Sequence, residues 1–289
     1  MPKHKSIYRS AKAKKAVLEL YDKQMKELNI PFKDIHVETL FGKTHLIECG
    51  ESDKPPLLVF HGGNATTAYN LKYCDFLLPH FHIYAVDTIG HPGKSAETSL
   101  SPFNQDYGKW AGEVIKKLGY EHISCFGGSF GAGILVKAMC TVPERISKSV
   151  LLVPSAIKNA PSIKSINMMF PMCMYYLTHK EKWFVKCILP MALKKEAISN
   201  DILLTAKCSI DNAKVKSIMP QNEREEQLRK YKNPVLVMAA EKDCLFPAAG
   251  VLQRSRKVWP QSCCYLLQGR GHIHELSRKE KQMIIKGLK

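Results

Sequence analysis

The chain has 289 residues, of which 45% are apolar and 24% charged, as in an ordinary globular protein with a buried core. Its 43 basic and 26 acidic residues give a net charge of +17, which raises nucleic acid, an anionic membrane surface or a lysine-rich proteome as explanations. The lysines are spread along the whole chain without a DNA-binding motif, so we expect no nucleic-acid partner.

Cysteine usage and hydropathy favour a cytoplasmic protein with reduced thiols. The ten cysteines form no C-x-x-C pair, and no apolar leader follows the basic first residues. The most apolar window, residues 166–177, is too short and too interrupted by Pro171 to span a bilayer. We therefore expect no transmembrane segment.

The N-terminal part, residues 1–29, is predicted to be a basic tail and a helix. Apolar residues recur at helical spacing over residues 11–28, before Pro31. Such a basic amphipathic helix can lie on a membrane, but its modest apolar face favours packing on the edge of a domain. Residues 35–41 and 44–48 then read as two strands of a hairpin.

Short apolar runs alternate with helix-prone segments through most of the remaining chain. Continuous apolar runs suit strands buried on both faces of a parallel sheet. The alternation predicts an α/β fold, with a mostly parallel central sheet, flanking helices and a site at the carboxyl ends of the strands. The predicted strands are residues 57–60, 82–86, 123–126, 149–153, 234–240 and 263–267, and the helices are residues 65–79, 104–118, 134–142, 247–257 and 275–288.

The composition changes within residues 155–232, where methionines and aromatic residues fall in helix-prone segments separated by prolines. We interpret this part as an inserted helical cap that divides the core into residues 30–154 and 233–289. Such side chains usually form a core, but above a site they also suit an adaptable apolar pocket. Met168, Met172 and Trp183 are therefore candidates for substrate contact.

A G-x-S-x-G motif, Gly127-Gly128-Ser129-Phe130-Gly131, lies between a predicted strand and a predicted helix. This is the pattern of a nucleophile elbow, in which the flanking glycines make room for a tight turn and the helix N-terminus favours developing negative charge. A glycine-rich turn with an incidental serine, or a phosphate-binding loop, would also contain such residues. Neither G-x-G-x-x-G nor the lysine of a P-loop is present.

A nucleophilic serine needs a base, a group that orients the base, and donors for the oxyanion. The candidate base is His272, in a glycine-containing loop after the last strand, with His274 as a rival. The candidate acid is Asp243, which follows the preceding strand and could also cap a helix, with Glu241 as a rival. The N–H of Phe130 and an N–H in the His61-Gly62-Gly63 loop are the expected oxyanion donors.

The candidate residues follow one another as Ser129, Asp243 and His272. With this order, residues 30–289 resemble an α/β-hydrolase of the carboxylesterase-like kind. The residues that carry the resemblance are His61-Gly62-Gly63, Asp87, Gly90 to Ser95, Gly127 to Gly131, Asp243 and Gly271-His272. The resemblance implies that Gly63 supplies the second oxyanion donor and that Asp87 and His91 hold loops rather than react. Lipases of the HGGG type have a third glycine where this chain has Asn64, so Asn64 stays open as the donor.

The predicted function is hydrolysis of carboxylic esters of small molecules through an acyl-enzyme. Ser129 would attack, His272 would transfer the proton, and Asp243 would orient His272, with no metal or organic cofactor. The same three residues could instead act on lactones, thioesters, amides or C–C bonds, or in acyl transfer. A ligand-binding sensor without turnover also stays open, and neither the acyl and alcohol preference nor the oligomeric state follows from the sequence.

Overall fold

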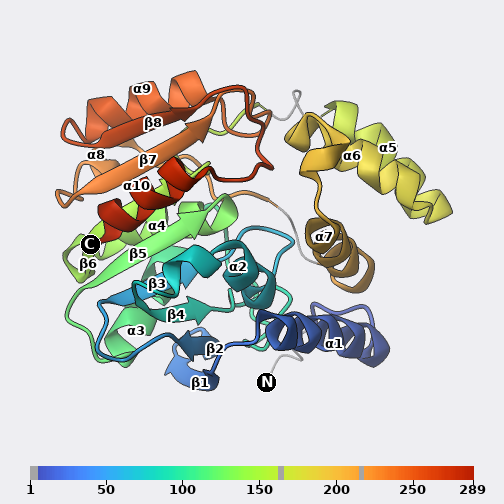
Figure 1. The fold of residues 1–289 in the computed structure, drawn as a ribbon, viewed down its shortest axis with the longest axis horizontal. Coiled ribbons are helices and arrows are strands. Elements are labelled where there is room, and N and C mark those ends of the chain that lie inside the picture. The colour runs from blue at the N-terminus through green and yellow to red at the C-terminus, as the bar shows by residue number, and fades with distance from the viewer. Residues whose placement is uncertain (1–5, 162–165, 215–217) are drawn as a thin grey trace.

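A computed structural model describes residues 6–161, 166–214 and 218–289 of the chain. Its centre is an eight-stranded sheet with the order β1-β2-β4-β3-β5-β6-β7-β8 (Figure 1). β1 pairs antiparallel with β2 and β2 with β4, and all other neighbouring strands are parallel. The strands are β1 (Phe32–Thr39), β2 (Gly42–Cys49), β3 (Pro56–Phe60), β4 (His82–Val86), β5 (Ile123–Gly128), β6 (Ile146–Leu152), β7 (Val235–Ala240) and β8 (Cys263–Leu267).

The central strands of the sheet are buried on both faces, as their continuous apolar runs predict, whereas the edge strand β1 is largely exposed. In β3, Leu58 and Phe60 belong to the core cluster on one face, whereas Leu57 and Val59 belong to the cluster on the other, because side chains alternate along a strand. The helices on the first face are α3 (Asp106–Lys117), α4 (Phe130–Thr141), α8 (Glu225–Leu228) and α9 (Ala248–Val258). Those on the second face are α1 (Ala11–Leu28), α2 (Thr67–Tyr73) and α10 (Arg278–Leu288). The predicted α/β class is therefore confirmed.

Helix α1 has the predicted bounds and packs against α2 and against α7 (Asn200–Asn212). Its buried side chains include Val17, Tyr21 and Met25, so its apolar face is covered within the molecule. No helix within the three described ranges is long and apolar enough to cross a bilayer.

Some element ends differ from the sequence-based bounds. Helix α2 is shorter than residues 65–79, since Thr66 caps its first turn by accepting a hydrogen bond from the Tyr69 N–H at 3.3 Å, and a separate 3₁₀ turn follows at Asp75–Leu77. Helix α10 begins three residues later than expected, because Ser277 and Glu280 form a capping box at its start.

Between β6 and β7 the chain leaves the sheet and forms α5 (Ile166–Thr178), α6 (Glu181–Ala192) and α7, which we call the inserted helices (Figure 1). They contain a small core of their own around Tyr175, Phe184 and Ile188. α8 follows them along the chain but packs on α4. The departing and returning chains are joined, because the Glu223 N–H donates to the Ala156 carbonyl at 2.8 Å and the Asn159 side chain donates to the Pro220 carbonyl at 2.9 Å.

Candidate active site

Ser129 lies in a sharp turn between the last residue of β5 and the first residue of α4. Its φ of 55° and ψ of −115° are strained for a residue with a side chain. The turn needs glycine on both sides, because a Cβ at Gly131 would lie 2.5 Å from the Phe60 carbonyl oxygen and one at Gly127 would lie 2.7 Å from the Ala132 nitrogen. The backbone is held by a hydrogen bond from the Ser129 N–H to the Leu152 carbonyl at 2.9 Å.

Three side chains from separate strand ends form one chain of hydrogen bonds. His272 Nε2 lies 2.9 Å from Ser129 Oγ, and His272 Nδ1 lies 2.8 Å from Asp243 Oδ2. A carboxylate only accepts, so Nδ1 carries the hydrogen and Nε2 is left as the acceptor for the serine hydroxyl. This is the arrangement in which a serine can lose its proton to a neighbouring base.

Asp243 is fixed by the turn in which it lies. Its Oδ1 accepts hydrogen bonds from the N–H groups of Leu245 at 2.7 Å and Phe246 at 3.0 Å, and its side chain is fully buried. Because α9 begins only at Ala248, these bonds close a turn before the helix rather than cap it. One carboxylate oxygen thus holds the turn and the other meets His272.

The two rival residues lie elsewhere. The Glu241 carboxylate accepts from the Gly269 N–H at 2.6 Å. His274 Nδ1 donates to the carbonyl oxygens of Gly271 at 3.0 Å and His272 at 3.1 Å. Burial lowers the pKa of His274, so its ring is neutral and Nε2 is a hydrogen-bond acceptor. This buried nitrogen has no partner among the described residues.

The loop after β3 lies directly against the serine turn. A Cβ on Gly62 would be 3.8 Å from Ser129 Cβ, and one on Gly63 would be 3.5 Å from Phe130 Cβ. His61 anchors the loop, since its Nδ1 donates to the Gly62 carbonyl at 2.8 Å and its Nε2 accepts from the Thr88 N–H at 3.0 Å. Phe130 is the first residue of α4, so its N–H has no acceptor one turn earlier in the helix.

Asp87 and His91 lie at buried positions behind this loop. Asp87 accepts from His45 Nδ1 at 2.8 Å and from the Lys94 N–H at 2.9 Å. Burial by itself would raise the pKa of Asp87, but the hydrogen bond and charge of His45 hold it below its ordinary value. Burial also lowers the pKa of His91, to about 3, and its neutral ring packs 4.7 Å from the Phe130 ring. Asp87 thus joins the backbone at Lys94 to His45 of β2, and His91 packs on the first residue of α4.

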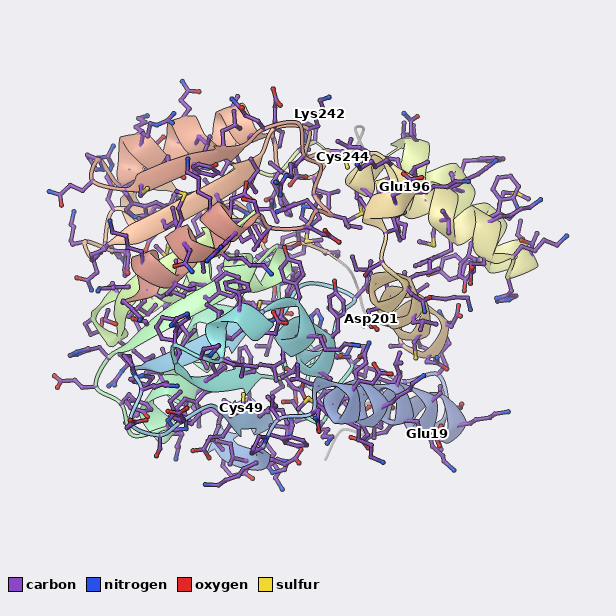
Figure 2. All side chains as sticks on the ribbon, in the orientation of Figure 1. Glu19, Cys49, Glu196, Asp201, Lys242 and Cys244 are labelled. Atoms are coloured by element: carbon purple, nitrogen blue, oxygen red, sulfur yellow. The ribbon has the colours of Figure 1, made fainter. Side chains whose placement is uncertain are left out.

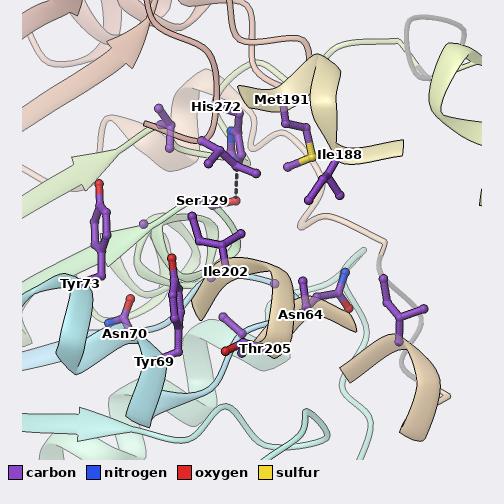
Figure 3. A pocket seen from close by; sticks show the side chains of 18 of the residues that line it. Asn64, Tyr69, Asn70, Tyr73, Ser129, Ile188, Met191, Ile202, Thr205 and His272 are labelled. Atoms are coloured by element: carbon purple, nitrogen blue, oxygen red, sulfur yellow. Dashed lines mark hydrogen bonds between the residues drawn. The ribbon is translucent and has the colours of Figure 1, made fainter. Parts of the chain in front are cut away.

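A cavity of about 260 Å³ opens beside Ser129 and His272 (Figure 3). Met168 and Met172, two of the three candidate contact residues, line it, but Trp183 does not. Successive residues of an α-helix point about 100° apart, so when Phe184 faces the cavity its neighbour Trp183 faces away from it. The apolar wall also contains Cys187, Ile188, Met191, Ile202, Ala206 and Ile210.

Another wall of the cavity is polar, and the sequence analysis did not predict it. It comes from Tyr69, Asn70 and Tyr73 on α2 (Figure 3), and Thr205 and His274 also line the cavity. The Tyr73 hydroxyl donates to the His274 carbonyl at 3.3 Å, whereas neither the Tyr69 hydroxyl nor the Asn70 side-chain amide bonds to another residue of the described ranges. Helical spacing marks α2 as a helix, but it does not show which of its faces borders a cavity.

The fold is similar to those of solved esterase structures. Naproxen esterase from Bacillus subtilis is 19% identical to this chain, and the superposition covers 96% of this chain and 99% of the esterase with a TM-score of 0.80. Carboxylesterase CesB (YbfK) from the same organism is 22% identical, with the same coverages and a TM-score of 0.80. The family model described as "alpha/beta hydrolase fold" matches residues 55–178. The chain has the α/β-hydrolase fold.

The chain is also similar in sequence to two carboxylesterases over part of its length. Carboxylesterase YbfK of Bacillus subtilis (strain 168) is 31% identical over 137 residues, which are 47% of this chain and 46% of that protein. Uncharacterized carboxylesterase nap of the same organism is 30% identical over 138 residues, with the same shares. The aligned part of the chain thus spans just under half the length of the curated relatives that it matches.

Proposed function

We propose that this α/β-hydrolase cleaves carboxylic esters of small molecules through an acyl-enzyme. The observation that carries the proposal is the hydrogen-bonded chain from Ser129 through His272 to Asp243, which opens into a largely apolar cavity. The likeness to relatives named carboxylesterases supports ester bonds over the other bonds that this fold can cleave.

In the proposed reaction, Ser129 Oγ attacks the acyl carbon while His272 Nε2 takes its proton. His272 then gives that proton to the alcohol as the C–O bond breaks, and a water activated by His272 hydrolyses the acyl-enzyme. Asp243 keeps the hydrogen on Nδ1 and stabilises the imidazolium. The N–H groups of Gly63 and Phe130 would hold the oxyanion, and loss of one such donor costs roughly 3 kcal/mol of transition-state stabilisation.

The two walls of the cavity indicate the kind of ester. We assign residues 155–232 as a cap that supplies the apolar wall, with Met168 and Met172 able to adapt to different apolar groups. Asn70, Tyr69 and His274 offer unpaired donors and acceptors on the other wall. A small ester that carries an apolar group and a hydroxyl would use both walls.

The first test compares two neighbouring histidines on a panel of p-nitrophenyl esters. His272→Asn removes the proposed base, so kcat should fall by about 10³-fold or more. His274→Asn, two residues away, is the comparison variant and should lose at most about tenfold, because its ring bonds to the Gly271 and His272 carbonyls and not to Ser129. Equal losses would contradict the assignment of the base.

Two other outcomes of this panel would overturn the proposed reaction. Faster turnover of a matched lactone, thioester or amide would show that the enzyme prefers that bond to a carboxylic ester. Labelling of Ser129 by a fluorophosphonate without turnover of any ester would indicate a ligand-binding sensor.

A second test concerns the polar wall. Asn70→Leu should lower kcat/KM for the p-nitrophenyl ester of 3-hydroxyphenylacetate about tenfold relative to the phenylacetate ester, since a buried hydrogen bond is lost. The matched pair 3-hydroxybenzyl acetate and benzyl acetate probes the alcohol side. Steady-state kinetics on all four esters measures the ratios. Unchanged hydroxyl selectivity on both pairs would show that Asn70 does not recognise this group.

The cysteines bear on where the reaction takes place. All ten lie in the described ranges, and each is unpaired. Burial raises the pKa of several of these thiols, for example that of Cys187 to about 11, so they stay protonated and unreactive at neutral pH. This state supports the proposal of a reducing compartment such as the cytoplasm.

A further inference from the structure

Helix α5 is apolar on two opposite faces. Its 13 residues include no Asp, Glu, Lys or Arg. Met168 and Met172 line the cavity and Tyr175 is fully buried, so one face is used inside the molecule. The other face is uncovered, because its large apolar side chains are between 49% and 78% exposed. We call this face the apolar stripe; its residues are Ile166, Met169, Phe170, Tyr176 and Leu177.

Helix α5 lies at the outer edge of the molecule, away from the central sheet (Figure 1). Figure 2 shows the side chains of α5 projecting outward from that edge. A helix at a protein surface normally presents polar residues to water, and an exposed apolar patch of this kind marks an interaction site. Neither the sheet nor the other helices cover the stripe, so its partner must come from outside the described chain.

Positive charge lies next to the stripe. The Phe170 ring contacts the Trp183 ring of α6 edge-on, at 5.9 Å between centroids. The ammonium groups of Lys182 and Lys186 lie 5.6 Å and 4.8 Å from the Trp183 centroid. The exposed Lys180 precedes α6, so lysines outnumber the single acidic residue of α6, Glu181.

This combination of features matches the surface layer of an anionic membrane. A helix of 13 residues extends only about 20 Å, too short for a hydrocarbon core of about 30 Å, but long enough to lie flat in the interface. Lysines at the edge of such a helix meet anionic headgroups, and tryptophan favours the headgroup level. A protein partner would equally bury the stripe, but it would not by itself explain lysines arranged around an aromatic ring beside the stripe.

We propose that the apolar stripe, with Lys182 and Lys186, binds an anionic phospholipid surface and seats the inserted helices in its interfacial layer. α5 would then have the membrane on one face and the cavity on the other, which places apolar, membrane-dissolved molecules next to the cavity wall. The binding surface itself does not depend on the proposed ester hydrolysis, and its test needs no substrate.

Vesicle flotation tests the proposal with the whole chain. Wild type should float with vesicles of phosphatidylcholine and phosphatidylglycerol, and less with phosphatidylcholine alone. The double variant Phe170→Asp/Leu177→Asp should bind both kinds of vesicle at least tenfold more weakly. The double variant Lys182→Gln/Lys186→Gln should lose about tenfold or more of its binding to the anionic vesicles only. Leu40→Asp is the matched control, because Leu40 is 92% exposed but lies in the β1–β2 turn, and it should bind like wild type.

Tryptophan fluorescence gives an independent readout. Trp110 and Trp259 are buried in the core, so a blue shift on adding anionic vesicles would come from Trp183. Thermal unfolding of each variant checks that it still folds. Undiminished flotation of Phe170→Asp/Leu177→Asp, or no flotation of wild type, would overturn the proposal. So would self-association of wild type that this variant abolishes without any vesicle binding, which would assign the stripe to a second copy.

Discussion

Replacing Ser129 with alanine should reduce turnover of a small p-nitrophenyl ester by about 10⁴-fold or more. The alanine keeps the backbone of the turn, whose hydrogen bond to Leu152 does not involve the side chain. It removes the only oxygen placed to attack beside His272 Nε2 in the described site. The remaining groups would still bind substrate and polarise its carbonyl, so a small residual rate over water is expected. Initial rates over a range of enzyme concentrations measure the loss.

Ser155→Ala is the matched control for this substitution. Ser155 is fully buried next to the same turn, and its Oγ donates to the Ser129 carbonyl at 3.2 Å. Its loss should cost about 1 kcal/mol of unfolding free energy and leave turnover within about tenfold. Equal turnover of wild type and Ser129→Ala would refute the acyl-enzyme. A loss as large in Ser155→Ala would point to disruption of the turn instead.

Lys137→Met should lower the free energy of unfolding by about 3–5 kcal/mol. Lys137 lies on α4, almost fully buried, and its ammonium group pairs with the buried Glu223 carboxylate. Glu223 also accepts two hydrogen bonds from Gln105 Nε2, at 3.0 Å and 2.9 Å. Without Lys137 the carboxylate keeps these bonds but loses its counter-charge in a largely buried site. Urea unfolding followed by circular dichroism measures the change.

Two further variants separate the loss of charge pairing from loss of packing. Lys137→Met/Glu223→Gln removes both charges and should recover part of the stability, because the uncompensated carboxylate is gone. Lys257→Met breaks the exposed pair with Glu225, whose N···O distance is 2.9 Å, and should leave the unfolding midpoint close to that of wild type. A single variant Lys137→Met that unfolds at the wild-type midpoint would show that the buried pair does not stabilise the fold.

The parts that could be predicted from the sequence are those that local chemistry determines. Short continuous apolar runs suit strands buried on both faces, and their alternation with helix-prone segments indicates a parallel sheet. The tight turn at Ser129 requires glycine at 127 and 131, so it is visible in the sequence. Because parallel strands end at one edge, Asp243 and His272 could be expected beside Ser129, and they lie within hydrogen-bonding distance in one chain.

The parts that could not be predicted depend on how helices rotate and on what they meet. Periodicity marks α6 as a helix, but whether Trp183 or Phe184 faces the cavity depends on a rotation of about 100° that only packing sets. Asn70 on α2 and the outward face of α5 were missed for the same reason. A helical pattern does not show that a given asparagine is buried or that a given phenylalanine is exposed, because both depend on the neighbouring elements.

The junction between the core and the inserted helices makes the fold modular. The departing chain at Ala156 and Asn159 is bonded to the returning chain at Pro220 and Glu223, so the sheet meets the insertion as a closed loop. Strands β6 and β7, which precede and follow the insertion, are parallel neighbours in the sheet. One bond still ties the insertion to the reactive centre, because the Ile273 N–H beside His272 donates to the Met191 carbonyl of α6 at 2.9 Å. An exchanged insertion would therefore change the ligand preference without moving His272 only if it kept a carbonyl at this position.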